Sequence, residues 1–147
     1  MTGTPGMADP DLPSDVQRFL HDQIDSLEQL ESLLLLFRSR DVTWSAAGVA
    51  KELLIADSVA EEALRALCQR GLLTIATTPE QFRYGPSSTE LAVLVERLGE
   101  LYTDQRAAIM RLMSANAIQR LRAGALGMFS NAAVAGKREK SGDGGAQ

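Results

Sequence analysis

The sequence has 147 residues, 45% of them hydrophobic and 23% charged, and a formal net charge of −4 at pH 7. Such a length and balance fit one soluble domain that buries a sizeable core. No stretch is apolar for long enough to cross a bilayer, because the most apolar run spans only residues 33–37.

The start of the sequence and its cysteine content both favour a cytoplasmic protein. Residues 1–15 hold acids and prolines but no basic segment followed by an apolar one, so no secretory signal is visible. The single cysteine, Cys68, has no partner for an internal disulfide, which suits a reducing compartment. Because Cys68 lies in an apolar helical pattern, we interpret it as a small core residue.

Taken in chain order, residues 1–13 are rich in Gly, Pro, Thr and Asp and are expected to form a disordered tail. Residues 15–24 then place apolar side chains at helical spacing. Ser26 and Gln29 form a capping box, in which each side chain bonds the free backbone N–H of the other residue. The helix that follows, over residues 27–40, is apolar almost all round and is predicted to be the central core helix.

Residues 41–44 are predicted to be extended, with Trp44 filling the core where the next helix begins. Ser45 caps that helix, residues 46–54, and a tight turn at 55–57 follows. Ser58 and Glu61 form a second capping box, which opens a helix that runs to residue 70. Gly71 then supplies the left-handed residue that ends it.

A β-hairpin is the simplest interpretation of residues 72–85. Two runs of β-favouring residues, 72–76 and 82–85, flank a turn that contains Pro79. Ser87 and Glu90 give a third capping box, from which one helix of about 25 residues is expected to run to Ser114. Its apolar residues repeat every three or four positions for three heptads, which predicts packing against another helix, either of the same chain or of a second chain.

The predicted order is helix, short strand, helix, turn, helix, hairpin and long helix. Over residues 27–85 this order, with the sequences "TWSAAGVAKELLIADSVAEEALRALCQRGLLT" and "FRYG", resembles the winged helix-turn-helix of bacterial transcription regulators such as the MarR and PadR families. The predicted fold class is therefore mainly α with a small β-hairpin. We expect a winged-helix domain at 14–88, helices for dimerisation or docking at 89–135, and a disordered tail at 136–147.

The resemblance implies that the helix at 58–70 enters the major groove of DNA as part of a homodimer. The implied DNA-binding residues are Ser58, Val59, Glu62, Arg65 and Gln69 of that helix, together with Lys51 and Arg83. The long helix is implied to hold two chains together, and the candidate interface residues are Leu91, Val95, Leu98, Tyr102, Ile109, Leu112, Leu121 and Phe129.

Two adjacent glutamates depart from that family pattern. Relatives often carry Ser, Thr, Arg or Gln at the positions of Glu61 and Glu62. One carboxylate can accept a hydrogen bond from cytosine N4, but two must also face the negative phosphates. Four cations offset them, and these are Lys51, Arg65, Arg70 and Arg83. Alternatively, the glutamates simply favour the start of a helix, whose dipole stabilises negative charge.

Two functions follow from these patterns. The first is a DNA-binding transcription regulator that acts as a homodimer on double-stranded DNA. The alternative is a winged-helix module that binds another protein through its acidic helix and does not bind DNA. This alternative is favoured by the charge of residues 41–88, which contain six acids and four bases. A typical DNA-binding domain is basic, whereas this chain is basic only over residues 116–147, with two acids and five bases.

Other classes of function have little support in the sequence. No catalytic constellation, phosphate-binding glycine loop or cofactor motif is present, so we expect no enzyme activity and no cofactor. His21 lies beside Asp22 and near Asp25, but one histidine without cysteines does not make a metal site. The amphipathic stretch from Ile118 to Phe129 is typical of a membrane-surface helix, but docking on its own domain or on a dimer partner is the simpler interpretation.

Overall fold

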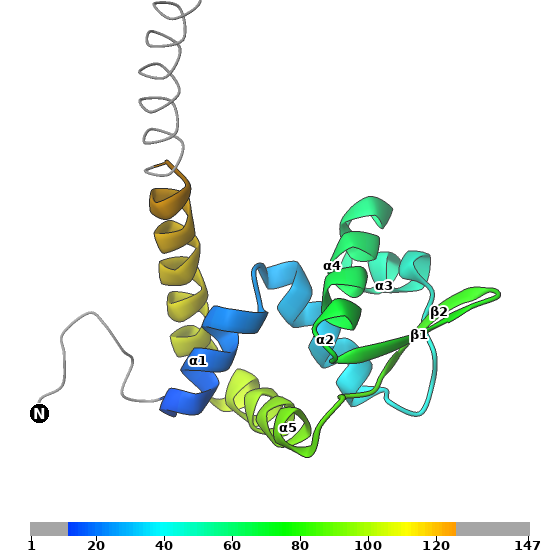
Figure 1. Ribbon diagram of the computed structural model, residues 1–147, viewed down its shortest axis with the longest axis horizontal. Helices are drawn as coiled ribbons and strands as arrows, with labels where there is room; N and C mark the ends of the chain where they lie inside the picture. The colour runs from blue at the N-terminus through cyan, green and yellow to red at the C-terminus, as the bar shows by residue number, and fades with distance from the viewer. Residues whose placement is uncertain (1–11, 126–147) are drawn as a thin grey trace, which may run out of the picture. The chain divides into compact units, whose positions relative to one another are not determined.

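The computed structural model describes residues 12–125, so Phe129, most of the predicted N-terminal tail and all of the predicted C-terminal tail lie outside the described residues. The chain divides into two compact units, residues 1–113 and residues 114–147. The first unit holds the helices α1 to α5 and both strands. The helices and the hairpin of this unit are labelled in Figure 1.

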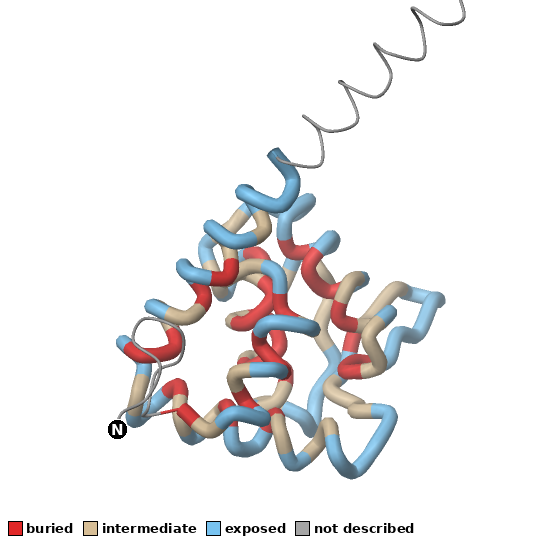
Figure 2. The backbone as a smooth tube through the Cα atoms, turned by 60° about the vertical axis from the view of Figure 1, so that its left-hand side comes forward, coloured by how far each residue is buried: buried red, intermediate tan, exposed pale blue. Residues whose placement is uncertain are grey.

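The helix α2 (Leu27–Arg38) is the central helix of the first unit, as predicted. Its buried face includes Leu30, Leu33, Leu34 and Leu36, and it contacts α3, α4, α5 and the second strand. The helix α1 (Ser14–Gln23) buries Val16, Phe19 and Leu20 and packs on α5. Figure 2 shows the buried residues along the inner sides of these helices, whereas the tip of the hairpin is exposed.

The helices α3 (Ala46–Leu53) and α4 (Asp57–Gln69) form the helix-turn-helix pair and pack against each other. Ser45 caps α3 as predicted, because its Oγ accepts the backbone N–H of Gly48 at 3.0 Å. Leu54 makes the turn between the helices in the left-handed conformation, with φ of 61°. This conformation costs a leucine roughly 1–2 kcal/mol, because its Cβ approaches the following carbonyl oxygen.

The strands β1 (Leu73–Thr77) and β2 (Glu80–Tyr84) form the predicted antiparallel hairpin, in which Ile75 pairs with Phe82. Only Thr78 and Pro79 remain unpaired at its tip, so the hairpin is longer and its turn tighter than the sequence indicates. Trp44 joins the hairpin through an isolated bridge to Phe82, and its indole N–H donates to Ser39 Oγ at 3.0 Å. Phe82 anchors the hairpin in the core because it is fully buried.

The predicted helix of 25 residues is wrong. The helix α5 (Thr89–Asp104) ends at Gln105, whose φ of −129° and ψ of 43° are not helical. A second helical segment covers residues 106–125, so Ser114 is not a helix end either. An unbroken helix would place the Gln105 amide in the apolar seam between Tyr102 and Ile109, where it would lose hydrogen bonds to water. The break removes this conflict.

Two of the predicted capping boxes are also wrong, and a third is partly formed. The helix α4 begins at Asp57 after Ala56, without a side-chain cap, and α5 is capped by Ser88 rather than Ser87. Ser26 accepts the N–H of Gln29 at 3.2 Å, but the Gln29 side chain accepts the N–H of Asp25 instead of that of Ser26. Neighbouring serines explain the error at α5, because either one can cap a helix.

Candidate nucleic acid interface

The side of α4 that faces away from the core is exposed along its length. Ala60, Ala63, Leu64 and Leu67 are buried and define the inner side of the helix. We call the opposite side the α4 outer face, and its exposed residues are Ser58, Val59, Glu61, Glu62, Arg65 and Gln69. Another macromolecule can therefore reach all five residues that the sequence placed on this helix as DNA contacts.

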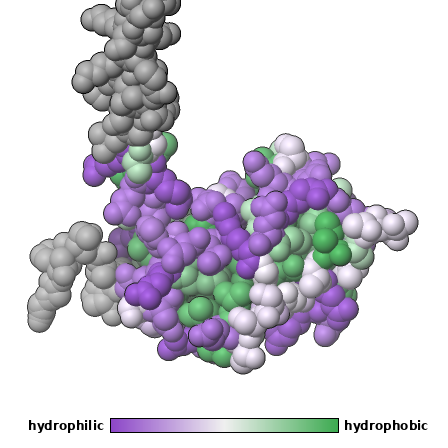
Figure 3. All heavy atoms as spheres, viewed as in Figure 1, coloured by the Kyte–Doolittle hydropathy of each residue, from purple (hydrophilic) through white to green (hydrophobic). Residues whose placement is uncertain are grey.

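The first part of the α4 outer face forms a shallow hollow. It has a volume of about 450 Å³ and is lined by Ser58, Val59, Glu61, Glu62 and Arg65. Figure 3 shows that the surface around the start of α4 is mostly hydrophilic in that view, whereas hydrophobic residues lie between α4 and the hairpin. The described residues that line the hollow therefore offer hydrogen-bonding and charged groups, and Val59 is the apolar side chain among them.

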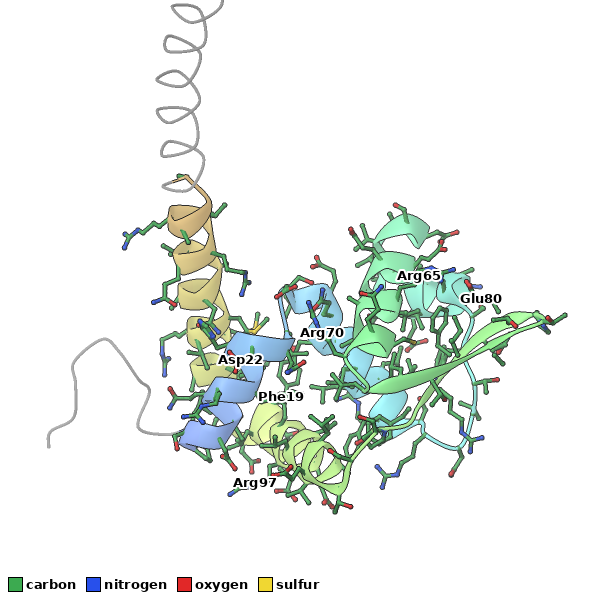
Figure 4. All side chains as sticks on the ribbon, viewed as in Figure 1. Phe19, Asp22, Arg65, Arg70, Glu80 and Arg97 are labelled. Carbon is green, nitrogen blue, oxygen red and sulfur yellow. The ribbon has the colours of Figure 1, made fainter. Side chains whose placement is uncertain are left out.

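Arg65 is held between two carboxylates. Its Nε donates to Glu61 Oε2 at 3.2 Å, and its Nη2 donates to Glu80 Oε2. We call Glu61, Arg65 and Glu80 the wing clasp, because they join α4 to the tip of the hairpin. Figure 4 shows Arg65 and Glu80 pointing toward each other from these two elements. The hydrogen bonds that Arg65 donates to Glu61 and, second in size of effect, to Glu80 raise the already high pKa of Arg65, so the guanidinium stays charged.

The two adjacent glutamates therefore differ in their surroundings. Glu61 is paired with Arg65 one helical turn further along, which is the spacing at which opposite charges meet on a helix. Glu62 is exposed and has no hydrogen bond or ion pair with any residue in the described part of the chain. The resemblance alone does not distinguish the two positions. In the folded chain they differ, because Glu61 is paired with Arg65 and Glu62 has no such pair among the described residues.

Arg70 does not belong to the α4 outer face, so the expectation that it offsets Glu61 and Glu62 is wrong. Its guanidinium turns to the other side, where Nη1 donates to the carbonyl of Gln23 at 2.6 Å and to Gln29 Oε1 at 2.8 Å. Nη2 pairs with Asp25 at 2.6 Å. Arg70 therefore fastens the end of α4 to the linker between α1 and α2.

The remaining candidate cations lie outside α4. Lys51 on α3 and Arg83 on β2 are both exposed. The Nε of Arg83 donates to the carbonyl of Arg40 at 3.2 Å, and the Arg40 guanidinium lies 4.6 Å from the centre of the Phe37 ring. Arg40 is thus a second arginine beside the hairpin. The sequence did not single it out, because its pattern places Arg40 at the end of the predicted helix 27–40 and it matches no motif, whereas α2 ends at Arg38.

Half of the residues expected at a dimer interface are core residues of the single chain. Val95, Leu98, Tyr102 and Ile109 are buried. Leu91 and Leu112 are half-buried, whereas Leu121 in the second unit is 73% exposed. In the first unit, α5 approaches α2 closely, because a Cβ added at Gly99 would meet the Phe37 ring at 3.2 Å. A contact between two chains therefore needs surface other than these four buried residues.

The structure also shows the surroundings of the residues that the sequence offered as weaker candidate sites. His21 Nδ1 lies 2.9 Å from Asp22 Oδ1, and both side chains are exposed. Among residues 12–125, no group of three His, Cys, Asp or Glu residues is placed to hold a metal ion. In the same range, no helix is both long and apolar enough to cross a membrane. Cys68 is half-buried, and this burial raises the pKa of its thiol.

Comparisons with known proteins find similarity in structure only. No protein-family model matches the chain, and no curated protein matches it. The similar solved structures include MepR, a transcription regulator of the Staphylococcus aureus multidrug efflux pump MepA, at 16% identity and a TM-score of 0.47, covering 80% of this chain and 87% of that one. The S. aureus MepR–DNA complex matches at 17% identity and a TM-score of 0.48, covering 80% of this chain and 89% of that one.

A third similar structure is a MepR mutant from S. aureus bound to an oligodeoxyribonucleotide, at 17% identity and a TM-score of 0.48, covering 80% of this chain and 87% of that one. Because the identity and the TM-scores are this low, the function of the present chain has to be inferred from its own residues. Its own elements follow the order of helix α2, helix-turn-helix, hairpin and helix α5. The predicted fold class is therefore confirmed: residues 27–84 form a winged helix-turn-helix.

Proposed function

We propose that this chain is a cytoplasmic DNA-binding transcription regulator that uses its winged helix-turn-helix to bind double-stranded DNA. The observation that carries the proposal is the exposed α4 outer face, with a hairpin beside it. A helix held in this way by a second helix can enter a major groove, while the hairpin contacts the backbone. The MepR structures with bound DNA have a similar fold, which is consistent with this reading.

The residues of the candidate interface are proposed to contact two parts of the DNA, the phosphates and the base edges. Lys51, Arg65 and Arg83 are the cations proposed to neutralise phosphates, since such contacts provide much of the affinity for DNA. Ser58 and Gln69 are exposed polar residues of the α4 outer face, where they offer hydrogen bonds to base edges. Binding also requires Arg65 to exchange a carboxylate of the wing clasp for a phosphate oxygen.

We further propose that two copies bind one site. Helix-turn-helix proteins commonly bind two half-sites as a dimer, with the half-sites one turn of DNA apart. The support in this chain is an apolar surface on the helical residues of the second unit, where Ile118 is 49% and Leu121 is 73% exposed. The dimer contact is therefore proposed at these residues.

The first prediction concerns salt. Fluorescence anisotropy with duplexes taken from around the chain's own gene is expected to show binding at 50 mM salt that weakens as salt is added. With three cations on phosphates, the slope of log K against log salt is expected to be about −3 per chain. Titration well above the dissociation constant is expected to give two chains per duplex. Absence of binding at 50 mM salt to every fragment would contradict the proposal.

The second prediction concerns the wing clasp. Replacing Glu80 with glutamine keeps the shape of the side chain but removes one of the two carboxylates that hold Arg65. Arg65 then reaches its phosphate more easily, so the affinity for duplex DNA is expected to rise several-fold at low salt, while the salt slope stays near about −3 per chain because the number of phosphate contacts is unchanged. The same anisotropy assay measures both the affinity and the slope.

Glu100→Gln is the matched control for that substitution. Glu100 is an exposed carboxylate on α5, so this variant has the same change in net charge but leaves the wing clasp intact. An equal gain in affinity for the two variants would mean that net charge, rather than release of Arg65, controls binding.

The alternative function is a protein-binding module, and the wing clasp is the observation that favours it. Arg65 is paired to both Glu61 and Glu80, so negative charge is in excess on this part of α4, and on the α4 outer face the Glu62 carboxylate has no ion pair among the described residues. Replacing Glu61 and Glu62 together with glutamine separates the two functions. A regulator is expected to bind DNA equally well or better after this change, whereas a module that recognises a basic protein surface would lose its partner.

A further inference from the structure

We infer that Glu62 selects a cytosine in the DNA site, and that Glu61 has no part in reading bases. This inference rests on the proposed DNA-binding function and assigns a specificity-determining residue within it. Glu61 and Glu62 are adjacent and carry the same charge, but their surroundings in the structure differ.

Glu62 lies near the middle of the α4 outer face, and Glu61 lies toward its edge. With 3.6 residues per turn, the direction opposite to the four buried residues of α4 passes close to Ser58 and Gln69, and Glu62 is roughly 30° from it. Glu61 is roughly 70° away on the other side, where Arg65 and Glu80 hold it. A base edge in front of this face would therefore meet Glu62 before Glu61.

The chemistry of an unpaired carboxylate limits the bases that it tolerates. It has only acceptors, so it needs a donor, and in the major groove cytosine offers the N4 amino group without an acceptor beside it on the same base. Guanine presents the acceptors N7 and O6, and thymine presents O4, so these bases repel the carboxylate. Adenine offers a donor at N6, but its N7 acceptor lies next to that donor.

Glu62 is thus expected to act more by rejecting wrong bases than by adding affinity. A carboxylate that enters the groove without a donor pays for lost hydration and for repulsion by the phosphates. A site with another base at that position does not provide the one compensating hydrogen bond. The carboxylate is then left unpaired in the groove, which disfavours binding to the competing sequence. Arg65 does not relieve the cost, because its ion pairs in this structure are with Glu61 and Glu80, and on DNA it exchanges one of these carboxylates for a phosphate oxygen.

Selection from a pool of duplexes with a random 20-base-pair core tests this assignment, with the full-length wild type, Glu62→Gln and Glu61→Gln in parallel at low salt. Both variants remove one negative charge, so Glu61→Gln is the matched control for any general gain in affinity. The wild type is expected to enrich cytosine about tenfold at one position of each half-site. Glu62→Gln is expected to lose that preference and to enrich adenine, since glutamine pairs with adenine N6 and N7.

The possible results distinguish a failure of the Glu62 assignment from a failure of the proposed DNA-binding function. Loss of the cytosine preference in Glu62→Gln, with the preference kept in Glu61→Gln, supports the assignment. If all three proteins enrich the same sequence, the assignment is wrong and the DNA-binding function stands. If the wild type enriches no sequence over the input pool, the proposed function itself fails and the assignment fails with it. Circular dichroism of the two variants verifies that both stay folded.

Discussion

Replacing Arg70 with alanine is expected to lower the free energy of unfolding by about 2–3 kcal/mol, because charged hydrogen bonds to partly buried groups are worth more than neutral ones. The Arg70 side chain is only 26% exposed and bonds the Gln23 carbonyl, the Gln29 side chain and Asp25. Its loss frees the linker between α1 and α2 from the end of α4. Urea denaturation followed by circular dichroism measures the change.

Arg97→Ala is the control for Arg70→Ala. Arg97 also forms one ion pair between distant parts of the chain, with Asp15, but both side chains are about half exposed, at 46% and 50%. Exposed pairs contribute about 0–1 kcal/mol, so this variant is expected to unfold at nearly the wild-type urea concentration. Equal losses of stability in the two variants would refute the clamping role assigned to Arg70.

Replacing Phe82 with alanine is expected to have the largest effect on stability, about 3–5 kcal/mol. Phe82 is fully buried and is the one residue of β2 that is. Its backbone also exchanges hydrogen bonds of 2.8 and 2.7 Å with Trp44. Without the ring, the hairpin loses its anchor and the core gains a cavity. Urea denaturation gives the loss of stability, and amide hydrogen exchange at Trp44 and Phe82 reports whether the hairpin has detached.

Ile75→Ala tests whether the anchor is Phe82 itself or any apolar residue of the hairpin. Ile75 pairs with Phe82 across the strands but is 37% exposed, so its truncation is expected to cost about 1 kcal/mol, less than half the loss at Phe82. Because the hairpin positions Arg83, which is proposed to contact a phosphate, Phe82→Ala is also expected to weaken DNA binding more than Ile75→Ala. Similar effects of the two substitutions would argue against a single anchor.

The parts of the fold that depend on neighbours in the sequence were predicted well. The apolar stripe of residues 27–40 identified the central helix, Ser45 identified the start of α3, and Gly71 with a φ of 77° ends α4 as expected. These features depend on spacing within one or two helical turns, so the local pattern contains the necessary information. The exposed α4 outer face was predicted for the same reason, because one side of an amphipathic helix is buried.

The helix boundaries that depend on contacts between elements were predicted less well. The pattern of residues 89–113 indicates one helix, but the structure breaks it at Gln105. The start of α4 at Asp57 without a side-chain cap was also missed, since packing against α2 and α3 stabilises this helix without one. Local signals compete with such packing, and the packing prevails where the two differ.

The sequence by itself determined which segments are helices, where the hairpin lies and which side of α4 is exposed, because these follow from short-range periodicity. Only the tertiary structure decided which charges remain available for binding. Arg65 meets Glu80 15 positions away, and Arg70 meets Asp25 45 positions away. An ion pair depends on the distance between two side chains in space, and no local pattern specifies that distance for residues on different elements. For this reason Glu61 and Glu62 are equivalent in the sequence and different in the folded chain.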